Sequence, residues 1–418
     1  MKIVTLSKEE FDNFSINHKY NSYYQSPEYG NFKKITEGYE VSYLGFIDDD
    51  KNLVGASMFL YKELFWKYKY AYAPRGMLLD YDDKELVISV TNELRRLLKK
   101  QKFIFIKIDP PIIASERDSE GNIINFNNTI NNVLNVFKNN GYEHLGFNLY
   151  DESLLPRWNV IAKLNTDARI TFNNFDSKVK ERISYANSMA ITVYEDDTVD
   201  IDRFYSFLRK SNIRKSKKYF ECMKDIFYPS RKIKIFYAFI DTNKYTMNAN
   251  RLYSQEEEKN NALSNIISSG DNVKYNISKA VNDKINSDKY LTAYKRDVVE
   301  STKLLKKFPE GIICGCSLCI EEATGATVLI NYEDAEYNKY HVNALLNYEM
   351  MKYFGKKNLK YLNLGSITGN FNPNSKFYKA LLSKIGFNST IIEYIGEFDM
   401  IISKFMYKIY KRKTKKEK

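Results

Sequence analysis

Cysteine, histidine and long apolar runs are all scarce in this chain of 418 residues. Four cysteines cannot form a disulfide framework, and three dispersed histidines (His18, His144 and His341) disfavour a Ser-His or Cys-His nucleophilic site. No apolar run approaches the roughly 18 residues that a membrane span requires, and the first residues lack the apolar core of a signal peptide. We therefore expect a cytoplasmic protein that does not span a membrane.

Motifs of common enzyme chemistry are also absent. The sequence has no G-x-G-x-x-G after a strand, no Walker loop, no H-E-x-x-H and no G-x-S-x-G. An enzyme of this kind would hold an activated donor next to an amine, while a carboxylate or the substrate itself moves the proton. We predict neither a cofactor nor a metal.

Three of the cysteines nevertheless lie close together. Cys314, Cys316 and Cys319 have the C-x-C-x-x-C spacing of a soft-metal site, but no fourth ligand is near them in the sequence. In an apolar strand, cysteine behaves as a small hydrophobic residue. We interpret the cluster as part of a core strand.

The composition is that of a globular protein with a basic surface. Hydrophobic residues make up 44% and aromatic residues 15% of the chain, and its length predicts two or more packed units. The 64 Lys and Arg against 52 Asp and Glu give a net charge of +12. This charge favours polyanionic partners such as RNA, phosphorylated ligands or anionic lipid headgroups, although lysines that only solubilise the surface would give the same balance.

Periodicity predicts a mixed α/β (α+β) fold. Strand and helix signals fill residues 1–150, including an amphipathic helix at 83–100 that leads into the apolar strand FIFIKID, and the pattern restarts near residue 159. Residues 245–308 lack strand signals and carry apolar residues at helical intervals. They predict two long helices joined by a turn in SSGDN (268–272), which form an antiparallel hairpin.

Four short segments carry candidate functional residues. YQSPEYGNFKK ends in Lys33 and Lys34, and APRGMLLDYDD places Arg75 on a turn. FIFIKIDPP places Asp109 at the end of an apolar strand, where partial desolvation would raise the pKa of its carboxyl group. GSITGNFNP is a loop of small residues suited to a turn near a ligand. A surface helix and a helix or turn cap are the structural alternatives for the first and third segments.

Seven segments, which follow one another along the chain in the order found in the family, resemble the Fem/MurM proteins. These proteins are the non-ribosomal peptidyltransferases of peptidoglycan cross-bridge synthesis. The segments extend from about residue 20 to residue 400, and they are YQSPEYGNFKK, YAPRGMLLDYDD, IKIDP, KVKERISYANSMAITV, LINYEDAEYNKYHVNALLNYEMM, LNLGSITGNF and IGFNSTIIEYIGEFD. The resemblance implies two domains related to the GNAT N-acyltransferase fold. Domain 1 would be 1–150 joined by about 390–418, and domain 2 would be 151–390 with the hairpin, 245–308, as its coiled-coil arm.

The resemblance also implies the reaction. An amino acid would pass from aminoacyl-tRNA to the side-chain amine of the third stem-peptide residue of lipid II or UDP-MurNAc-pentapeptide, which forms interpeptide bridges. An aminoacyl ester is already activated, so the reaction requires stabilisation of a tetrahedral oxyanion but no nucleophilic side chain. Contact with the inner membrane leaflet and a homo- or heterodimer with related transferases are further expectations.

Individual residues carry over from the family motifs. Lys33 matches the lysine that contacts the precursor pyrophosphate, and Lys215, beside Arg214, falls where an arginine commonly serves the same phosphates. Lysine keeps the charge but lacks the bidentate fork, so either Arg214 takes the role or the headgroup is held more loosely. Tyr219 shares that helical face. Arg75 and Tyr332 are further candidate substrate-binding residues in matching segments.

Two residues are assigned to catalysis by the same resemblance. Asp109 matches a strand-end aspartate and is the candidate general base. Lys384, in LSKIGF, matches the lysine of an F-K-x-G-F motif that steadies the tRNA end or the oxyanion. Ser383 replaces the aromatic residue of that motif, which removes any stacking there.

Two other functions compete with this hypothesis. An acyl-CoA-dependent GNAT N-acyltransferase would share the fold, but the chain lacks a Q/R-x-x-G-x-G/A pyrophosphate loop. A non-catalytic RNA- or envelope-binding protein would use the basic surface alone. The arm likewise has two interpretations, since its lysines suit tRNA contact while its interspersed acids suit a solvated spacer or a dimer contact.

Overall fold

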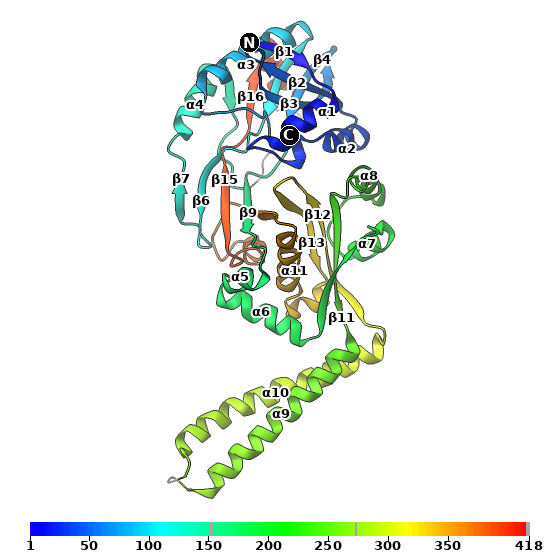
Figure 1. The fold of residues 1–418 in the computed structure, drawn as a ribbon, viewed down its shortest axis with the longest axis vertical. Coiled ribbons are helices and arrows are strands. Elements are labelled where there is room, and N and C mark those ends of the chain that lie inside the picture. The colour runs from blue at the N-terminus through cyan, green and yellow to red at the C-terminus, as the bar shows by residue number, and fades with distance from the viewer. Residues whose placement is uncertain (151–153, 272–273, 415–418) are drawn as a thin grey trace.

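The computed structural model describes residues 1–150, 154–271 and 274–414. Figure 1 shows two β-sheets, one above the other, and a long helical hairpin that projects from the lower end of the molecule. The mixed α/β fold class predicted from the sequence is confirmed. No helix among the described residues is both long and apolar enough to cross a bilayer.

The first sheet is formed mainly by the N-terminal third of the chain. In order across the sheet, its strands are β1 (Lys2–Thr5), β2 (Glu40–Ile47), β3 (Leu53–Phe65), β4 (Tyr68–Ala73), β5 (Phe103–Ile108), β16 (Phe398–Ile401) and β8 (Tyr142–His144). The associated helices are α1 (Lys8–Asn17), η1 (Tyr23–Gln25), α2 (Pro27–Glu37), α3 (Lys84–Lys100), α4 (Ile130–Asn139) and α13 (Lys404–Thr414). The helix predicted at 83–100 is α3, whose N-cap Asp83 accepts the N–H of Leu86.

The second sheet carries helices on both faces. Its strands are β10 (Ile191–Asp196), β11 (Ile233–Ile240), β12 (Ile312–Glu321), β13 (Gly325–Glu333), β14 (Tyr361–Ser366), β9 (Trp158–Lys163), β15 (Ser389–Tyr394), β6 (Ile113–Arg117) and β7 (Ile123–Phe126). Its helices are α5 (Ala168–Asn173), α6 (Ser177–Ser188), α7 (Ile201–Leu208), α8 (Lys217–Phe227), η2 (Ala335–Tyr340), α11 (Val342–Lys356) and α12 (Tyr378–Leu382).

Sheet membership does not follow chain order. Strands β6 and β7 precede residue 150 but pair through β15 with the second sheet, whereas β16, near the C-terminus, pairs with β5 in the first. The chain therefore crosses between the two sheets several times. A division into domains at residue 150 stays a prediction.

A parallel strand pair opens in the second sheet. Strands β13 and β14 pair only from Gly325–Tyr361 to Thr327–Asn363, and β14 then pairs with β9 alone. In the first sheet, by contrast, the parallel pair β4 and β5 stays together from Lys69 to Ala73. The backbone edge of β13 beyond residue 327 is thus left without a neighbouring strand on its β14 side.

The predicted antiparallel hairpin is confirmed. Helices α9 (Thr242–Ser269) and α10 (Ile277–Lys307) pack along their length and are inserted between β11 and β12 (Figure 1). Gly270, in the predicted turn, ends α9 with a left-handed φ of 64°. Asn272 of that turn lies outside the described residues, as do residues 415–418 of the basic tail.

The three clustered cysteines are core residues of β12. Cys314 and Cys319 pack in the hydrophobic cluster that contains α11, and Cys316 packs in the cluster that contains α8. A bulge at Cys314, between the pairs Ala238–Gly315 and Phe239–Ile313, changes which side of the strand faces α11. The interpretation as core residues is confirmed, and side chains on opposite faces of a sheet do not bind one metal ion.

Candidate active site

A cleft of about 590 Å³ opens where β13 and β14 part. Helices α2 and α8 form one rim, and the end of β14 together with the loop after α12 forms the other. Four of the residues singled out from the sequence line it, namely Lys33, Lys215, Tyr219 and Lys384. The structure therefore brings together residues that are up to 351 positions apart in the chain.

Two lysines stand at the α2–α8 rim. Lys33 projects from α2, where its ammonium pairs with Glu37 and lies 5.8 Å from the centre of the Tyr29 ring. Lys215, just before α8, lies over the ring of Tyr219 at 4.7 Å. The two helices are joined by Phe32, whose ring meets Tyr219 edge-on at 5.0 Å. This rim presents two cations on an aromatic support.

The motif YQSPEYG explains how α2 is held. Ser26 caps the helix by accepting the N–H of Tyr29, and Pro27 occupies its first turn. The buried amide of Gln25 accepts the N–H of Met58 at 2.9 Å and donates to the carbonyl of Pro74 at 2.7 Å. Gln25 thus fixes the start of α2 to β3 and to the turn that carries Arg75.

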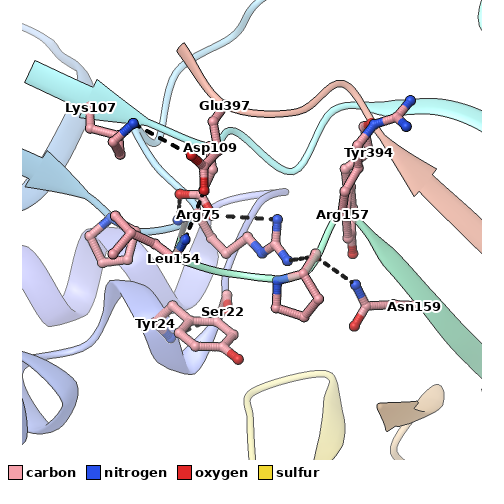
Figure 2. Close-up of polar contacts among 12 residues, drawn as sticks. Ser22, Tyr24, Arg75, Lys107, Asp109, Leu154, Arg157, Asn159, Tyr394 and Glu397 are labelled. Carbon is pink, nitrogen blue, oxygen red and sulfur yellow. Dashed lines mark hydrogen bonds and ion pairs between the residues drawn. The ribbon is translucent and has the colours of Figure 1, made fainter. Parts of the chain in front are cut away.

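Arg75 and Asp109 lie behind the cleft wall. Both side chains are buried, with 6% and 2% of their surface exposed. Asp109 accepts the backbone N–H of Arg75 at 2.8 Å, and its other oxygen lies 3.5 Å from the guanidinium (Figure 2). The guanidinium also donates to the carbonyl oxygen of Pro156 at 2.5 Å and lies over the ring of Tyr394.

A second buried charge holds the same segment of the wall. The backbone N–H of Leu154 donates to Glu397 at 3.0 Å, and Lys107 pairs with Glu397 and Asp399. Leu154 and Pro156 both line the cleft. Arg75 and Glu397 therefore fix the position of this wall through its backbone.

The burial of Asp109 bears on its predicted role as general base. Burial raises the pKa of this carboxyl group to about 7, although the Arg75 guanidinium opposes the rise. The carboxylate does not line the cleft, and Arg75 lies between it and Pro156. A proton from a substrate amine would have to pass Arg75, so the geometry favours a positioning role for Asp109.

Asp109→Asn is expected to change how stability depends on pH. The folded protein holds the Asp109 proton up to about pH 7, whereas the unfolded chain releases it near pH 4. The contribution of the protonated Asp109 to the free energy of unfolding is therefore fully present below pH 4. It is lost as pH rises through 7, and the loss amounts to at most about 4 kcal/mol. Denaturant unfolding of wild type and of Asp109→Asn should be measured from pH 4 to 8. Over this range the free energy of unfolding of wild type should fall by this amount relative to that of the variant. A constant difference would contradict the assignment.

Lys384 stands at the opposite end of the cleft. Its ammonium donates to the carbonyl of Ser366 at 2.7 Å, and desolvation lowers the pKa of the amine to about 8. A Cβ at Gly365, whose φ is 92°, would lie 3.2 Å from this ammonium and 3.3 Å from the carbonyl of Val328. The glycine in LNLGS therefore leaves room for Lys384 beside the open edge of β13.

Lys384→Arg is expected to alter the pH profile of activity. The charge of Lys384 is lost as pH rises through about 8, whereas arginine stays charged. If the cation stabilises developing negative charge, the ratio of wild-type to variant rate should fall about tenfold between pH 7 and 9. Single-turnover rates of both proteins at each pH would give this ratio, with Lys384→Met as the inactive control. A ratio that does not change with pH would exclude the charged form as the active one.

Three of the predicted binding residues do not line the cleft, and one of them, Arg75, is buried behind its wall. Arg214 is exposed in the loop before α8, while its neighbours Ile213 and Lys215 both line the cavity. Tyr332 lies on β13, where its ring packs against Phe207 at 5.5 Å. Their assignment to substrate binding stays a prediction.

The structure also shows cleft residues that the sequence reasoning did not single out. Asn331 and Asn343 line the cleft, and the side-chain oxygen of Asn343 is buried without a hydrogen-bond partner among the described residues. Both lie in the quoted segment LINYEDAEYNKYHVNALLNYEMM. Only its resemblance to the family pointed to this segment, because asparagine has no distinguishing spacing there.

The fold and the cleft define a mixed α/β protein whose second sheet opens at a parallel strand pair. The chain belongs to the FemAB family, since the model of that family matches residues 6–415. Aminoacyltransferase FemB of Staphylococcus epidermidis is 26% identical over 98% of this chain and 97% of that protein. Aminoacyltransferase FemA of Staphylococcus epidermidis is 24% identical over the full length of both.

A solved structure agrees with the fold. The crystal structure of FemX superposes with a TM-score of 0.74 at 20% identity, covering 98% of this chain and 99% of that one. Together, the family and its relatives establish the chain as an aminoacyltransferase. Membership supports a general role in building the interpeptide bridges of peptidoglycan.

Proposed function

We propose that the protein transfers an amino acid from an aminoacyl-tRNA to the side-chain amine of the third stem-peptide residue of a peptidoglycan precursor. The acceptor is lipid II or UDP-MurNAc-pentapeptide, and the work is done in the cytoplasm. The observation that carries this proposal is a single cleft with two lysines at one end and Lys384 beside an open strand edge at the other.

The acceptor end suits a pyrophosphate. Lys33 and Lys215 offer two ammonium groups that line one rim, and Tyr29 and Tyr219 give them an aromatic support. Lysine acts as a point charge and does not form the planar bidentate contact of arginine. The headgroup is therefore held mainly by charge, with the stem peptide extending into the cleft.

The donor end suits an aminoacyl ester. The backbone of β13 from Val328 to Asn331 lines the cleft without a pairing strand on its β14 side, and the backbone polar groups of that edge can bind the ester. Lys384 supplies a cation for the tetrahedral oxyanion, and Asn343 offers an unsatisfied acceptor for an N–H of the donor. The arm formed by α9 and α10 offers exposed lysines to the tRNA backbone.

The bond changes require no covalent enzyme intermediate. The acceptor amine attacks the ester carbonyl, an amide C–N bond forms, the C–O bond to the ribose breaks, and the amine proton passes to the leaving ribose oxygen. No histidine or cysteine among the described residues lines the cleft. The reaction is accelerated by positioning and by charge stabilisation.

An acyl-CoA donor is disfavoured by one contact. The N-terminus of the helix after an opened strand is a natural site for a pyrophosphate, because its N–H groups are unsatisfied. Here that helix is α11, and the carboxylate of Glu333 accepts the N–H of Asn343 at 3.0 Å. A carboxylate in this position repels the phosphates of coenzyme A.

A comparison of donors tests the proposal. Purified protein and UDP-MurNAc-pentapeptide or lipid II are incubated with mixed aminoacyl-tRNA, with the same tRNA after ribonuclease digestion, or with acetyl-CoA. We expect product only with intact aminoacyl-tRNA. Product with acetyl-CoA would support the GNAT alternative, and binding of RNA without any product would support a non-catalytic protein.

A further inference from the structure

The surface of α13 combines exposed aromatic residues with cations. Phe405 is 72% exposed on this helix, and Trp66 is 67% exposed at the tip of the β3–β4 hairpin nearby. We define the α13 surface by these two residues and four exposed cations around them, Lys67, Lys404, Lys408 and Arg412. Phe405, Lys408 and Arg412 share one helical face because they follow the spacing i, i+3, i+7.

The hairpin tip and the helix are in contact. The ammonium of Lys413 lies 4.3 Å from the centre of the Phe65 ring and 4.9 Å from that of Trp66. The opposite face of α13 is fixed, because Met406 and Tyr407 are buried against β5. The exposed face is therefore presented by a rigid support.

The hairpin turn is unusual for its residues. Phe65 pairs with Tyr68, so Trp66 and Lys67 form a two-residue turn, with φ values of 51° and 62°. A turn of this type favours Asn-Gly, because other residues are strained at positive φ. A tryptophan is held here in an unfavourable conformation and is still left in solvent.

The cations of the α13 surface have few acidic neighbours. Among the described residues, Lys411 pairs with Glu143, whereas Lys67, Lys404, Lys408 and Arg412 have no carboxylate within 4.0 Å. Aromatic residues set among lysines on a helix face are typical of a surface that lies at the headgroup level of a bilayer. We propose that the α13 surface docks on an anionic membrane, with Trp66 and Phe405 inserted between the lipid headgroups.

A chain of aromatic contacts, in which Phe105 and Tyr39 are buried, links α13 to the acceptor end of the cleft. Tyr410 of α13 contacts Phe105 at 4.8 Å, Phe105 stacks on Tyr70 at 5.6 Å, and the hydroxyl of Tyr70 bonds that of Tyr39 at 2.8 Å. Lys33 lies 5.8 Å from the Tyr39 ring. Docking would therefore bring Lys33 close to the bilayer. This consequence rests on the proposed function and favours a lipid-linked acceptor over a soluble one.

Vesicle sedimentation tests the docking surface. The full-length protein is mixed with phosphatidylcholine vesicles that contain either no phosphatidylglycerol or equal parts of it. We expect binding only to the anionic vesicles. The variant Trp66→Ser/Phe405→Ser should bind at least tenfold more weakly. The affinity of Lys408→Gln/Arg412→Gln for the anionic vesicles should fall about fivefold for each cation removed. Met247→Ser, which alters an equally exposed side chain on the arm, should bind as wild type does.

Transfer assays separate this proposal from the reaction itself. With UDP-MurNAc-pentapeptide in solution, the aromatic variant should keep the wild-type rate, which also shows that it is folded. With the precursor embedded in anionic vesicles, its rate should fall by the same factor as its binding. Wild-type protein that ignores anionic vesicles, or variants that bind them equally well, would overturn the proposal. Loss of tRNA affinity in the aromatic variant without loss of vesicle binding would assign the surface to RNA. Absence of transfer by wild type to both the soluble and the vesicle-embedded precursor would count against the reaction and leave the sedimentation test intact.

Discussion

Arg75→Met is expected to lower the free energy of unfolding by about 3–5 kcal/mol near pH 8, where Asp109 is ionised. The substitution removes the guanidinium that faces the Asp109 carboxylate and leaves that charge buried without its ion-pair partner. It also releases the carbonyl of Pro156, which lines the cleft. We expect the transfer rate to fall about 100-fold, because small displacements of a positioned substrate have effects of that size.

A double substitution separates stability from function. Arg75→Met/Asp109→Leu removes both charges and should recover most of the lost stability, since an apolar pair of similar volume commonly replaces a buried ion pair without cost. Its transfer rate should stay low, because Pro156 is still not held. Denaturant unfolding and single-turnover kinetics measure the two quantities. Recovery of the rate together with the stability would show that Arg75 has no role beyond folding.

Lys33→Ala is expected to raise the KM for the pyrophosphate-linked acceptor about 10- to 150-fold. A hydrogen bond to a charged group contributes about 1.5–3 kcal/mol, and Lys33 supplies one of two cations at the acceptor rim. The KM for the aminoacyl-tRNA should not change, because the donor occupies the other end of the cleft. Steady-state kinetics with each substrate varied in turn would measure both constants.

The neighbouring lysine provides the matched control. Lys34 lies on the same helix and carries the same charge, but it is exposed and does not line the cleft. Lys34→Ala should leave both KM values within twofold of wild type. Equal losses in the two variants would reduce the role of Lys33 to a general electrostatic one.

Much of the fold could be predicted from local patterns. The apolar spacing in residues 245–308 is long and regular, and it located both arm helices, while Asp83 and the leucines after it located α3. Strand order could not be predicted in the same way. Nothing local in IASER or in FDMI indicates that β6 joins the second sheet and β16 the first, because that choice depends on pairing between residues hundreds of positions apart.

The sequence pointed to some of the residues that line the cleft, but not to the geometry of the cleft. Lys33, Lys215, Tyr219 and Lys384 were named from motif order, and they line one cleft. The position of Asp109 at a strand end correctly indicated burial, but it did not show that Arg75 lies between the carboxylate and the cleft. The parting of β13 and β14 after Thr327 and Asn363 had no signal in the sequence of either strand.

The mass of the product tests the central claim most directly. The protein is incubated with total charged tRNA and lipid II, and the lipid-linked product is analysed by mass spectrometry and fragmentation. We expect a mass gain of one amino-acid residue, located on the side chain of the third stem-peptide residue. No gain in mass, or a gain located elsewhere on the precursor, would contradict it.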